Sequence, residues 1–179
     1  SAAYEYQALY GQTEDYFQIR GETNQNRYLR MQSILVRIEA SDDAFSIFSR
    51  LFNAKLSGSK TIVSVSKDSP DDFRVWMRLK APLIGMTYQE ESQADIAKDI
   101  SNYERIRFAS PEAVDDHLAE KAAAEGIYIA CEKPHIDGRV ELILYFREQS
   151  VSHSYHRYGN LGYHQLTEEA TEIEAPGEL

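Results

Sequence analysis

Apolar and polar residues in the middle of the chain follow a pattern that predicts strands alternating with helices. Residues 33–39 are rich in β-branched side chains and predict a first strand. From Asp42 to Ser57 apolar residues recur at helical spacing, and Gly58 has the position of a glycine that ends a helix. The apolar stripe of this helix, expected to face the core, consists of Phe45, Phe48, Leu51, Phe52 and Leu56.

The strand and helix pattern continues to residue 131. A Ser-Pro pair followed by acids predicts a helix capped by Ser69 and ended by Pro82, and a second helix capped by Ser110 that runs through Ala124 to a stop at Gly126. The inner face of the first would carry Phe73, Trp76, Met77 and Leu79 or Lys80. A shorter helix is predicted at residues 93–100, and four further strands at residues 61–66, 86–89, 105–109 and 127–131.

Strands and helices alternating at this spacing predict an α/β fold, a Rossmann-like three-layer sandwich with a mainly parallel five-stranded sheet. The two ends leave this pattern. Residues 1–32 are rich in Tyr, Gln and Asn with little period, Val140 to Gln149 predicts a last helix, and Ser150 to His156 alternates like an edge strand. The predicted units are an N-terminal arm (1–32), the Rossmann-like domain (33–149), a C-terminal β-flap (150–163) and a disordered acidic tail (164–179).

Charge limits the classes of partner. With 29 acidic and 19 basic residues the net charge is −10, which makes nucleic acids and anionic membranes poor partners. No apolar run approaches the ~20 residues that cross a bilayer, and a single cysteine is compatible with a cytoplasmic location. The opening Ser-Ala-Ala lacks an initiator Met and indicates a piece of a longer protein. Half of the net charge comes from the tail, in Glu168, Glu169, Glu172, Glu174 and Glu178.

A dinucleotide site is the usual chemistry of a Rossmann-like sheet, and its signal is missing. Such a site needs a glycine-rich turn after a strand, so that the pyrophosphate can approach a helix N-terminus. The first strand is followed by Glu39-Ala40-Ser41-Asp42-Asp43, and acids also follow Ser69 and Ser110. Ordinary helix capping by Ser and Asp explains these junctions, and we therefore predict no cofactor-binding residue.

Catalytic and metal-binding residues are not predicted either. Cys131 has His135 four residues away, but a cysteine that closes a buried strand is usually a small hydrophobe, and Glu132 would raise the pKa of the thiol. His153, His156 and His164 do not share one strand face, and no Cys or Asp joins them as a zinc ligand.

The most unusual stretch lies near the C-terminus, where rings, a cation and two glycines are concentrated. Tyr, His and Arg are typical of interface cores, because rigid amphipathic side chains gain contact area at low entropic cost. We therefore predict a contact segment here, and not a catalytic one. The predicted contact residues are Ser150, Ser152, Tyr155, His156, Arg157, Tyr158, Gly159 and Asn160.

Three passages together resemble a known family. They are Tyr16-Phe17-Gln18-Ile19-Arg20-Gly21-Glu22-Thr23-Asn24-Gln25-Asn26-Arg27-Tyr28, Asp137-Gly138-Arg139-Val140-Glu141-Leu142-Ile143-Leu144-Tyr145, and the run from Arg147 through Glu148-Gln149-Ser150-Val151-Ser152 to Leu161. They look like the C-terminal, aldehyde-dehydrogenase-like region of bifunctional proline utilization A proteins and related 1-pyrroline-5-carboxylate (L-glutamate γ-semialdehyde) dehydrogenases.

The resemblance implies a role without chemistry of its own. In that family a flavin-dependent domain oxidises proline and an NAD-dependent aldehyde dehydrogenase domain oxidises the semialdehyde. The region after the dehydrogenase, a Rossmann sheet with a β-flap, packs on that domain and helps enclose the route of the intermediate. This chain lacks the catalytic-cysteine motif of the dehydrogenases and the flavin barrel, so NAD and FAD are expected in the parent enzyme only.

Two other hypotheses stay open from the residues alone. One is an independent protein-interaction domain that uses the aromatic ends of the chain. The other is a small stand-alone NAD(P)-binding enzyme. If the family resemblance holds, the expected partner is the aldehyde dehydrogenase domain of the same polypeptide or a second copy of the chain.

Overall fold

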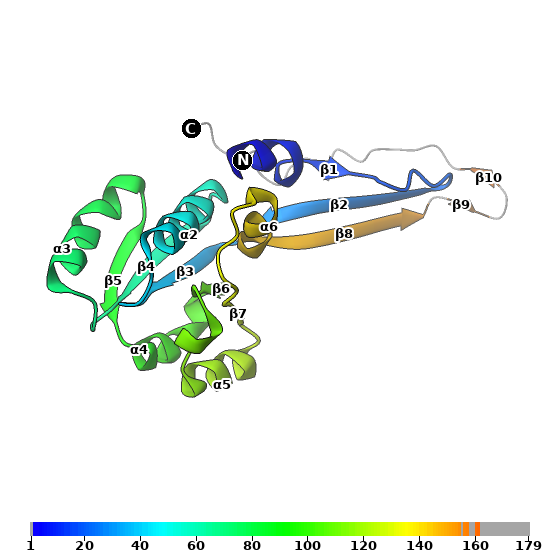
Figure 1. Ribbon diagram of the computed structural model, residues 1–179. Coiled ribbons are helices and arrows are strands. Elements are labelled where there is room, and N and C mark those ends of the chain that lie inside the picture. The colour runs from blue at the N-terminus through cyan, green and yellow to red at the C-terminus, as the bar shows by residue number, and fades with distance from the viewer. Residues whose placement is uncertain (1, 155, 158–159, 162–179) are drawn as a thin grey trace.

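The computed structural model, which describes residues 2–154, 156–157 and 160–161, is built around a five-stranded sheet (Figure 1). The strands are β3 (Ser33–Ile38), β4 (Lys60–Ser66), β5 (Thr87–Glu91), β6 (Arg105–Arg107) and β7 (Tyr128–Ala130). They are all parallel, in the order β5-β4-β3-β6-β7, with Val36 of β3 opposite Val63 on one side and Arg107 on the other. The predicted five-stranded parallel sheet is confirmed.

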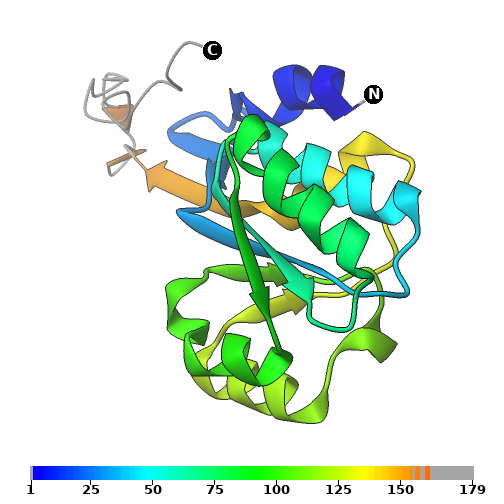
Figure 2. The same cartoon turned by 90° about the vertical axis from the view of Figure 1, so that its left-hand side faces the viewer.

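Helices cover both faces of this sheet (Figure 2). On one face lie α2 (Ala44–Leu56) and α3 (Asp71–Lys80), and on the other α4 (Gln93–Lys98) and α5 (Asp116–Glu125). Because side chains of a strand alternate between faces, Ile34, Val36 and Ile38 enter the core under α2, and Leu35 enters the core under α4 and α5. The Rossmann-like three-layer sandwich follows from these two cores.

A second, antiparallel sheet projects from the first and forms the β-flap. Its strands are β1 (Thr13–Glu14), β2 (Glu22–Arg30) and β8 (Phe146–Ser154), in the order β1-β2-β8. The pairing of β2 with β8 runs from Glu22 opposite Ser154 to Arg30 opposite Phe146. Since β2 continues into β3 after only Met31 and Gln32, the flap is a direct extension of the central sheet (Figure 1).

The root of the flap is an aromatic cluster supplied by the N-terminal segment. That segment forms α1 (Ala2–Glu5) and a π-helical turn, η1 (Tyr6–Tyr10). The ring of Tyr10 lies 4.5 Å from that of Tyr28 and 4.9 Å from that of Phe146, measured between centroids. The first helix also lies against α6 (Gly138–Leu142), where the backbone of Ala2 leaves no room for a side chain at Gly138. Residues that we assigned to an arm are therefore part of the folded core.

Two expectations for the chain ends are wrong. The helix expected from Val140 to Gln149 ends at Leu142, and after η5 (Ile143–Tyr145) the strand β8 begins at Phe146, four residues before the predicted flap. Residues 1–32, which showed no period, contain β2. Nearly every residue of β2 is half-buried, so no alternation of inside and outside was available in its sequence.

The helix starts also differ from the expectation. Pro70, and not Ser69, precedes α3. The helix expected from Ser110 is split into a short turn, η4 (Pro111–Ala113), and α5, whose N-cap is Asp115. Two further short 3-10 turns are η2 (Pro82–Ile84) and η3 (Ile100–Asn102). The predicted stops hold, because Gly58 and Gly126 both have the left-handed backbone that favours glycine.

Of the side chains predicted to face inward on α2 and α3, Leu51 and Met77 are buried, but most of the aromatic ones are not. Along α2 the buried residues are Ser46, Ile47, Arg50, Leu51, Asn53 and Ala54, while Phe45, Phe48 and Phe52 are 50%, 56% and 53% exposed. Arg50 takes the inner position because it donates to the carbonyls of Ser46 and Arg37 and to Asp42. In α3 only Met77 is buried, and Trp76 and Leu79 face outward.

One buried ion pair connects the sheet to the flap. Arg107, the last residue of β6, lies 3.0 Å from the carboxylate of Glu141 on α6, and both side chains are fully buried. Glu141 also accepts from the hydroxyl of Tyr145 at 2.8 Å and from the backbone N–H of His135 at 2.9 Å. Arg107 donates to the carbonyl of Glu132 at 2.7 Å. Apart from the carbonyl of Phe108, the partners of this pair lie in β7 or in the segment that leads from β7 to β8.

Removing one charge of the pair should be strongly destabilising. We expect Glu141→Gln to lower the free energy of unfolding by about 3–5 kcal/mol, because Arg107 would stay buried without a counter-charge. The double variant Arg107→Met/Glu141→Leu should lose less than either single variant. Urea unfolding measures both effects. As a control, Lys121→Ala breaks the exposed pair of Lys121 with Glu125 and should change stability by less than about 0.5 kcal/mol. A cost for Glu141→Gln as small as that of the control would contradict the assignment.

Candidate functional site

The predicted contact residues that the structure describes lie on the flap strand β8 and on a separate two-stranded sheet, β9-β10. Ser150 and Ser152 are exposed on β8, opposite Asn26 and Asn24, and the hydroxyl of Ser152 donates to the Asn24 side chain at 2.7 Å. His156 belongs to β9 (His156–Arg157), which pairs with β10 (Asn160–Leu161). Tyr155, Tyr158 and Gly159 lie outside the described residues, as does the predicted tail, residues 164–179.

The flap has a long open strand edge along β8 in the part of the chain that the structure describes. Strand β8 is the last strand in the order β1-β2-β8, so only one of its two edges is paired there. Cross-strand contacts on the flap are polar, for example the 2.6 Å hydrogen bond from Arg27 to the side chain of Gln149. A long unpaired edge offers backbone donors and acceptors to another strand. The flap can therefore bind a partner through its backbone as well as through its side chains.

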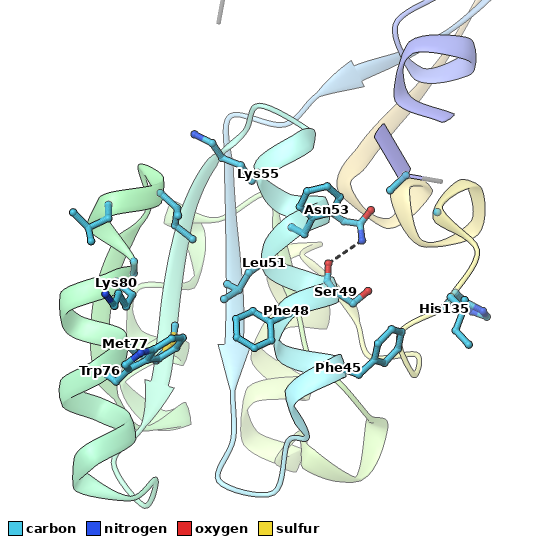
Figure 3. A pocket seen from close by; sticks show the side chains of 17 residues that line it. Phe45, Phe48, Ser49, Leu51, Asn53, Lys55, Trp76, Met77, Lys80 and His135 are labelled. Atoms are coloured by element: carbon cyan, nitrogen blue, oxygen red, sulfur yellow. Dashed lines mark hydrogen bonds between the residues drawn. The ribbon is translucent and has the colours of Figure 1, made fainter. Parts of the chain in front are cut away.

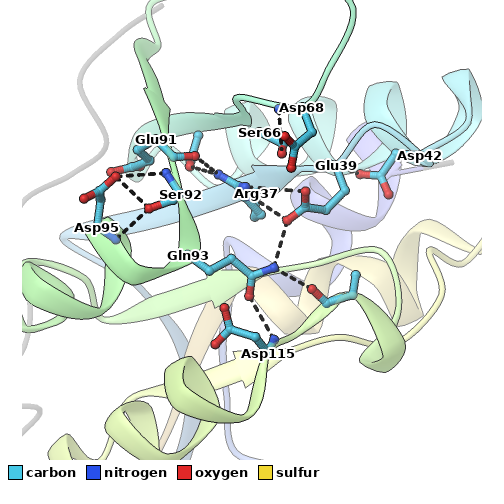
Figure 4. A network of polar contacts seen from close by, with 12 residues as sticks. Arg37, Glu39, Asp42, Ser66, Asp68, Glu91, Ser92, Gln93, Asp95 and Asp115 are labelled. Carbon is cyan, nitrogen blue, oxygen red and sulfur yellow. Dashed lines mark hydrogen bonds and ion pairs between the residues drawn. The ribbon is translucent and has the colours of Figure 1, made fainter.

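The second place to consider is the carboxyl edge of the parallel sheet, where such folds bind ligands. Four helices begin there, and a side chain of this protein caps three of them, α2, α4 and α5, whereas α3 has no side-chain cap. Figure 4 shows Ser92, Asp95 and Asp115 at this edge. Asp43 accepts from the N–H of Ser46 at 2.7 Å, Asp115 accepts from that of Leu118 at 2.7 Å, and Ser92 forms a capping box with Asp95. At these three N-termini, N–H groups that would bind a phosphate are thus already paired with acceptors.

The crevice between β3 and β6 is bridged as well. In a sheet of this strand order the crevice lies where the order reverses, and it is the usual ligand position. Gln93 of α4 donates to Glu39, after β3, at 3.0 Å and to the carbonyl of Ala113, after β6, at 2.7 Å. Its oxygen accepts from the N–H of Asp115 at 2.9 Å. A cleft of about 440 Å³ remains beside this bridge, with both basic and acidic walls.

Buried Arg37 completes this network. Its guanidinium lies 2.7 Å from Glu39 and donates to the hydroxyl of Ser64 at 3.0 Å and the carbonyl of Glu91 at 2.8 Å (Figure 4). Burial raises the pKa of the Glu91 carboxyl. Hydrogen bonds from Lys98, Ser92 and Lys67 hold the pKa of Asp95 well below its ordinary value. The acids predicted to oppose phosphate are present at this edge, but Gln93, Ser92 and Asp115 were not recognised in the sequence.

Cys131 and the histidines do not form a reactive group in the described residues. Burial, and then the neighbouring charge of Glu132, raises the pKa of the Cys131 thiol, which opposes formation of the thiolate. His135 uses its backbone N–H for Glu141, and His153 is exposed opposite Thr23 on the flap. Among the described residues no three side chains of His, Cys, Asp or Glu are grouped as a metal site. Within the same residues, no helix has the length and apolar character needed to span a membrane.

A third surface was missed by the sequence analysis, because its residues were expected in the core. The outward-facing aromatic side chains of α2 and α3 line an apolar groove of about 800 Å³, completed by Leu83, Ile84 and Ile136 (Figure 3). The rings of Phe48 and Trp76 meet edge to face across it at 6.2 Å. Ile136 is 87% exposed. An exposed patch of this kind marks a binding surface in soluble proteins.

The capping box of α4 should make stability depend on pH. Because the folded pKa of Asp95 lies below its unfolded value of about 3.9, its contribution is complete above that pH and is lost as the pH falls below it. We expect Asp95→Asn to lower the urea midpoint at pH ~7 and to differ less from the unchanged protein at pH ~3. Glu120→Gln, at an exposed acid of α5, is the matched control. An equal difference at both pH values would show that charge at Asp95 is not the cause.

Comparison with known proteins finds similarity in structure only. No protein family and no curated sequence matches the chain. Among solved structures, a PutA protein from Anabaena variabilis, provisionally named an aldehyde dehydrogenase, superposes with a TM-score of 0.54 and 18% identity, over 73% of this chain and 28% of that one. Proline utilization A from Bdellovibrio bacteriovorus gives a TM-score of 0.50 and 15% identity, over 72% of this chain and 14% of that one.

This chain therefore corresponds to a small part of each of these proteins, 28% and 14% of their lengths. At such identities the likeness concerns the fold. It agrees with the family resemblance seen in the sequence and with the α/β architecture of the sheet and flap. In its fold, the chain is a PutA-like and aldehyde-dehydrogenase-like region.

Proposed function

We propose that the chain is a non-catalytic C-terminal domain of a proline-catabolising 1-pyrroline-5-carboxylate dehydrogenase, in the route from proline to glutamate. It would pack on the dehydrogenase domain and help enclose the route of the intermediate. The parent, an enzyme expected in the cytoplasm, would carry NAD and, where fused to proline dehydrogenase, FAD. The fold likeness to regions of PutA proteins supports a dehydrogenase-related domain.

The observation that carries the proposal is the state of the carboxyl edge. The sheet has the strand order of a dinucleotide-binding fold, yet Gln93 bridges the crevice and Asp43, Asp95 and Asp115 lie at the helix N-termini. A pyrophosphate there would displace paired carboxylates and meet their charge. A domain that keeps this fold without an accessible phosphate site contributes surface and shape to its enzyme.

The flap supplies the contact surface in this proposal. Strand β8 offers an open edge, and the residues beyond it include an arginine, which can fork onto a carboxylate or carbonyl edge. Tyrosines such as Tyr155 and Tyr158 bury rings while their hydroxyls stay paired, and Gly159 permits a close turn. The partner is the aldehyde dehydrogenase domain of the same polypeptide or a second copy of the chain.

An independent protein-interaction domain is the second candidate. The exposed aromatic groove between α2 and α3 favours it, since no residue of the flap strands lines that groove. The two candidates differ in whether a dehydrogenase depends on this region for its output.

The isolated chain should not bind NAD. We expect calorimetric titration to give no saturable heat with a dissociation constant below ~1 mM, because paired carboxylates occupy the phosphate positions. Gln93→Gly and Asp43→Gly together would open the crevice and free the N-terminus of α2, and they form the informative comparison. Saturable binding to the unchanged chain would remove the main support for the non-catalytic assignment.

In the full-length parent, Arg157→Ala/Tyr158→Ala should reduce coupled conversion of proline to glutamate by about ten-fold, as expected when well-packed interface side chains are lost. Proline oxidation measured alone should be unchanged, since this reaction does not use the enclosed route. Lys121→Ala, on the exposed face of α5, is the control. The contact role is wrong if coupled turnover is intact, or if the double variant unfolds the isolated domain.

A further inference from the structure

The groove between α2 and α3 is an apolar surface that has no role in the flap-based function. It is lined by the exposed rings of Phe45, Phe48, Phe52 and Trp76, with the helix-end residues Leu83 and Ile136 (Figure 3). The three phenylalanines follow one another at spacings of three and four residues along α2, so they form one row. A row of this kind fits the apolar face of a second helix.

The charged residues that line the groove indicate which kind of helix it binds. The protein has a net charge of −10, but the charged side chains lining the groove are Lys55 and Lys80, both basic. Neither forms an ion pair with any residue in the described ranges. Two copies that placed their grooves face to face would bring like charges together, which opposes that arrangement. The occupant should instead be an apolar helix face bordered by acids.

The chain itself carries one segment with this pattern. Leu166, Ala170 and Ile173 are spaced by four and three residues, and on a helix they fall within a stripe about 60° wide. Glu169 and Glu174 border this stripe on its two sides. Pro176 and Gly177 then follow, as they do after a helix end. A helix this short is marginal alone and forms only when its apolar face is bound.

We propose that the acidic segment Leu166–Glu174 of a second copy of the chain docks as a helix in the groove between α2 and α3. Leu166, Ala170 and Ile173 lie on the phenylalanine row, and Glu169 and Glu174 pair with Lys55 and Lys80. Reciprocal exchange of this segment closes the assembly at two chains. This inference does not depend on the proposed function.

The length of the chain between β8 and Leu166 is the reason why we assign the segment to a second copy. The flap strand β8 carries the chain about 27 Å from Phe146 to Ser154, away from the central sheet. The pairing of Leu161 with His156 keeps Leu161 within about 13 Å of Ser154, and five residues then add at most about 18 Å before Leu166. A fully extended linker therefore just reaches the base of the flap, where the Lys55 and Gly138 end of the groove lies. The segment would enter its own groove only with the linker drawn out almost completely, whereas the segment of a second copy has no such constraint.

Trp76 gives a direct measure of occupancy. It is the single tryptophan of the chain, it lines the groove, and it is 39% exposed. In a Leu166→Ser/Ile173→Ser variant, a synthetic peptide of residues 163–179 should shift the Trp76 emission to shorter wavelength in a saturable way. The same peptide with Ser at both positions should not. A peptide without effect on the emission overturns the proposal.

The mass of the assembly and charge-reversal variants test whether the segment comes from a second copy. Sedimentation should show a dimer for the full chain. It should show a monomer for Leu166→Ser/Ile173→Ser and for Phe48→Ser. The control Thr167→Ser/Thr171→Ser changes the outer side of the helix and should still be dimeric. Lys55→Glu/Lys80→Glu should weaken dimerisation about ten-fold, and Glu169→Lys/Glu174→Lys should restore it. Thermal unfolding checks that each variant is folded.

Three results would refute the docking. A chain that stays monomeric up to ~0.5 mM has no exchange of the segment. A dimer that is indifferent to the Leu166 and Ile173 substitutions is formed by another surface, such as the β8 edge. A monomer whose Trp76 emission responds to those substitutions holds the segment of its own copy. The NAD titration and the coupled turnover are unaffected by these outcomes, so the proposed function is tested separately.

Discussion

The position of the flap depends on the buried pair of Arg107 and Glu141. A buried charge is tolerated only when its partners are fixed, and this pair has partners on β6, on α6 and in the loop between β7 and α6. Helix α6 has only five residues and is too short to be stable alone. It is held by Glu141 and by Asp137, which accepts from the N–H of Arg139 at 2.9 Å. Tyr145 and Phe146 follow directly, so the pair sets where β8 begins.

The burial pattern of each strand explains which parts of the fold were predictable from the sequence. Strand β4 is buried at every position after the first, so it appears in the sequence as an unbroken strand of a covered parallel sheet. Strands β2 and β8 are paired with each other across more than a hundred residues, and neither alternates between buried and exposed positions. Their strand structure is decided by this long-range pairing and by the root cluster of Tyr10, Tyr28 and Phe146. Local patterns contain neither.

Helix α2 shows a different limit of sequence reasoning. Its polar residues Ser46, Arg50 and Asn53 face inward, and its phenylalanines face outward, which inverts the usual assignment of a helix face. Arg50 is stable inside because Asp42 and two backbone carbonyls are within hydrogen-bond reach. An apolar stripe on a helix predicts that other apolar residues will pack on it. It does not say whether those residues belong to the same domain or to a partner. Here the expected core stripe became the wall of the groove.

The carboxyl edge of the parallel sheet has features that the sequence predicts and features that depend on long-range contacts. The acids after the first, second and fourth predicted strands were identified because they are adjacent in the chain. The bridge of Gln93 was not identified, because it joins the end of β3 to the loop after β6 and its donors and acceptors are separated by up to 54 residues. In this sheet the position that a ligand would occupy is bridged by the protein's own amide and carboxylates. The two surfaces proposed for binding, the β8 edge and the groove between α2 and α3, both lie outside this crevice.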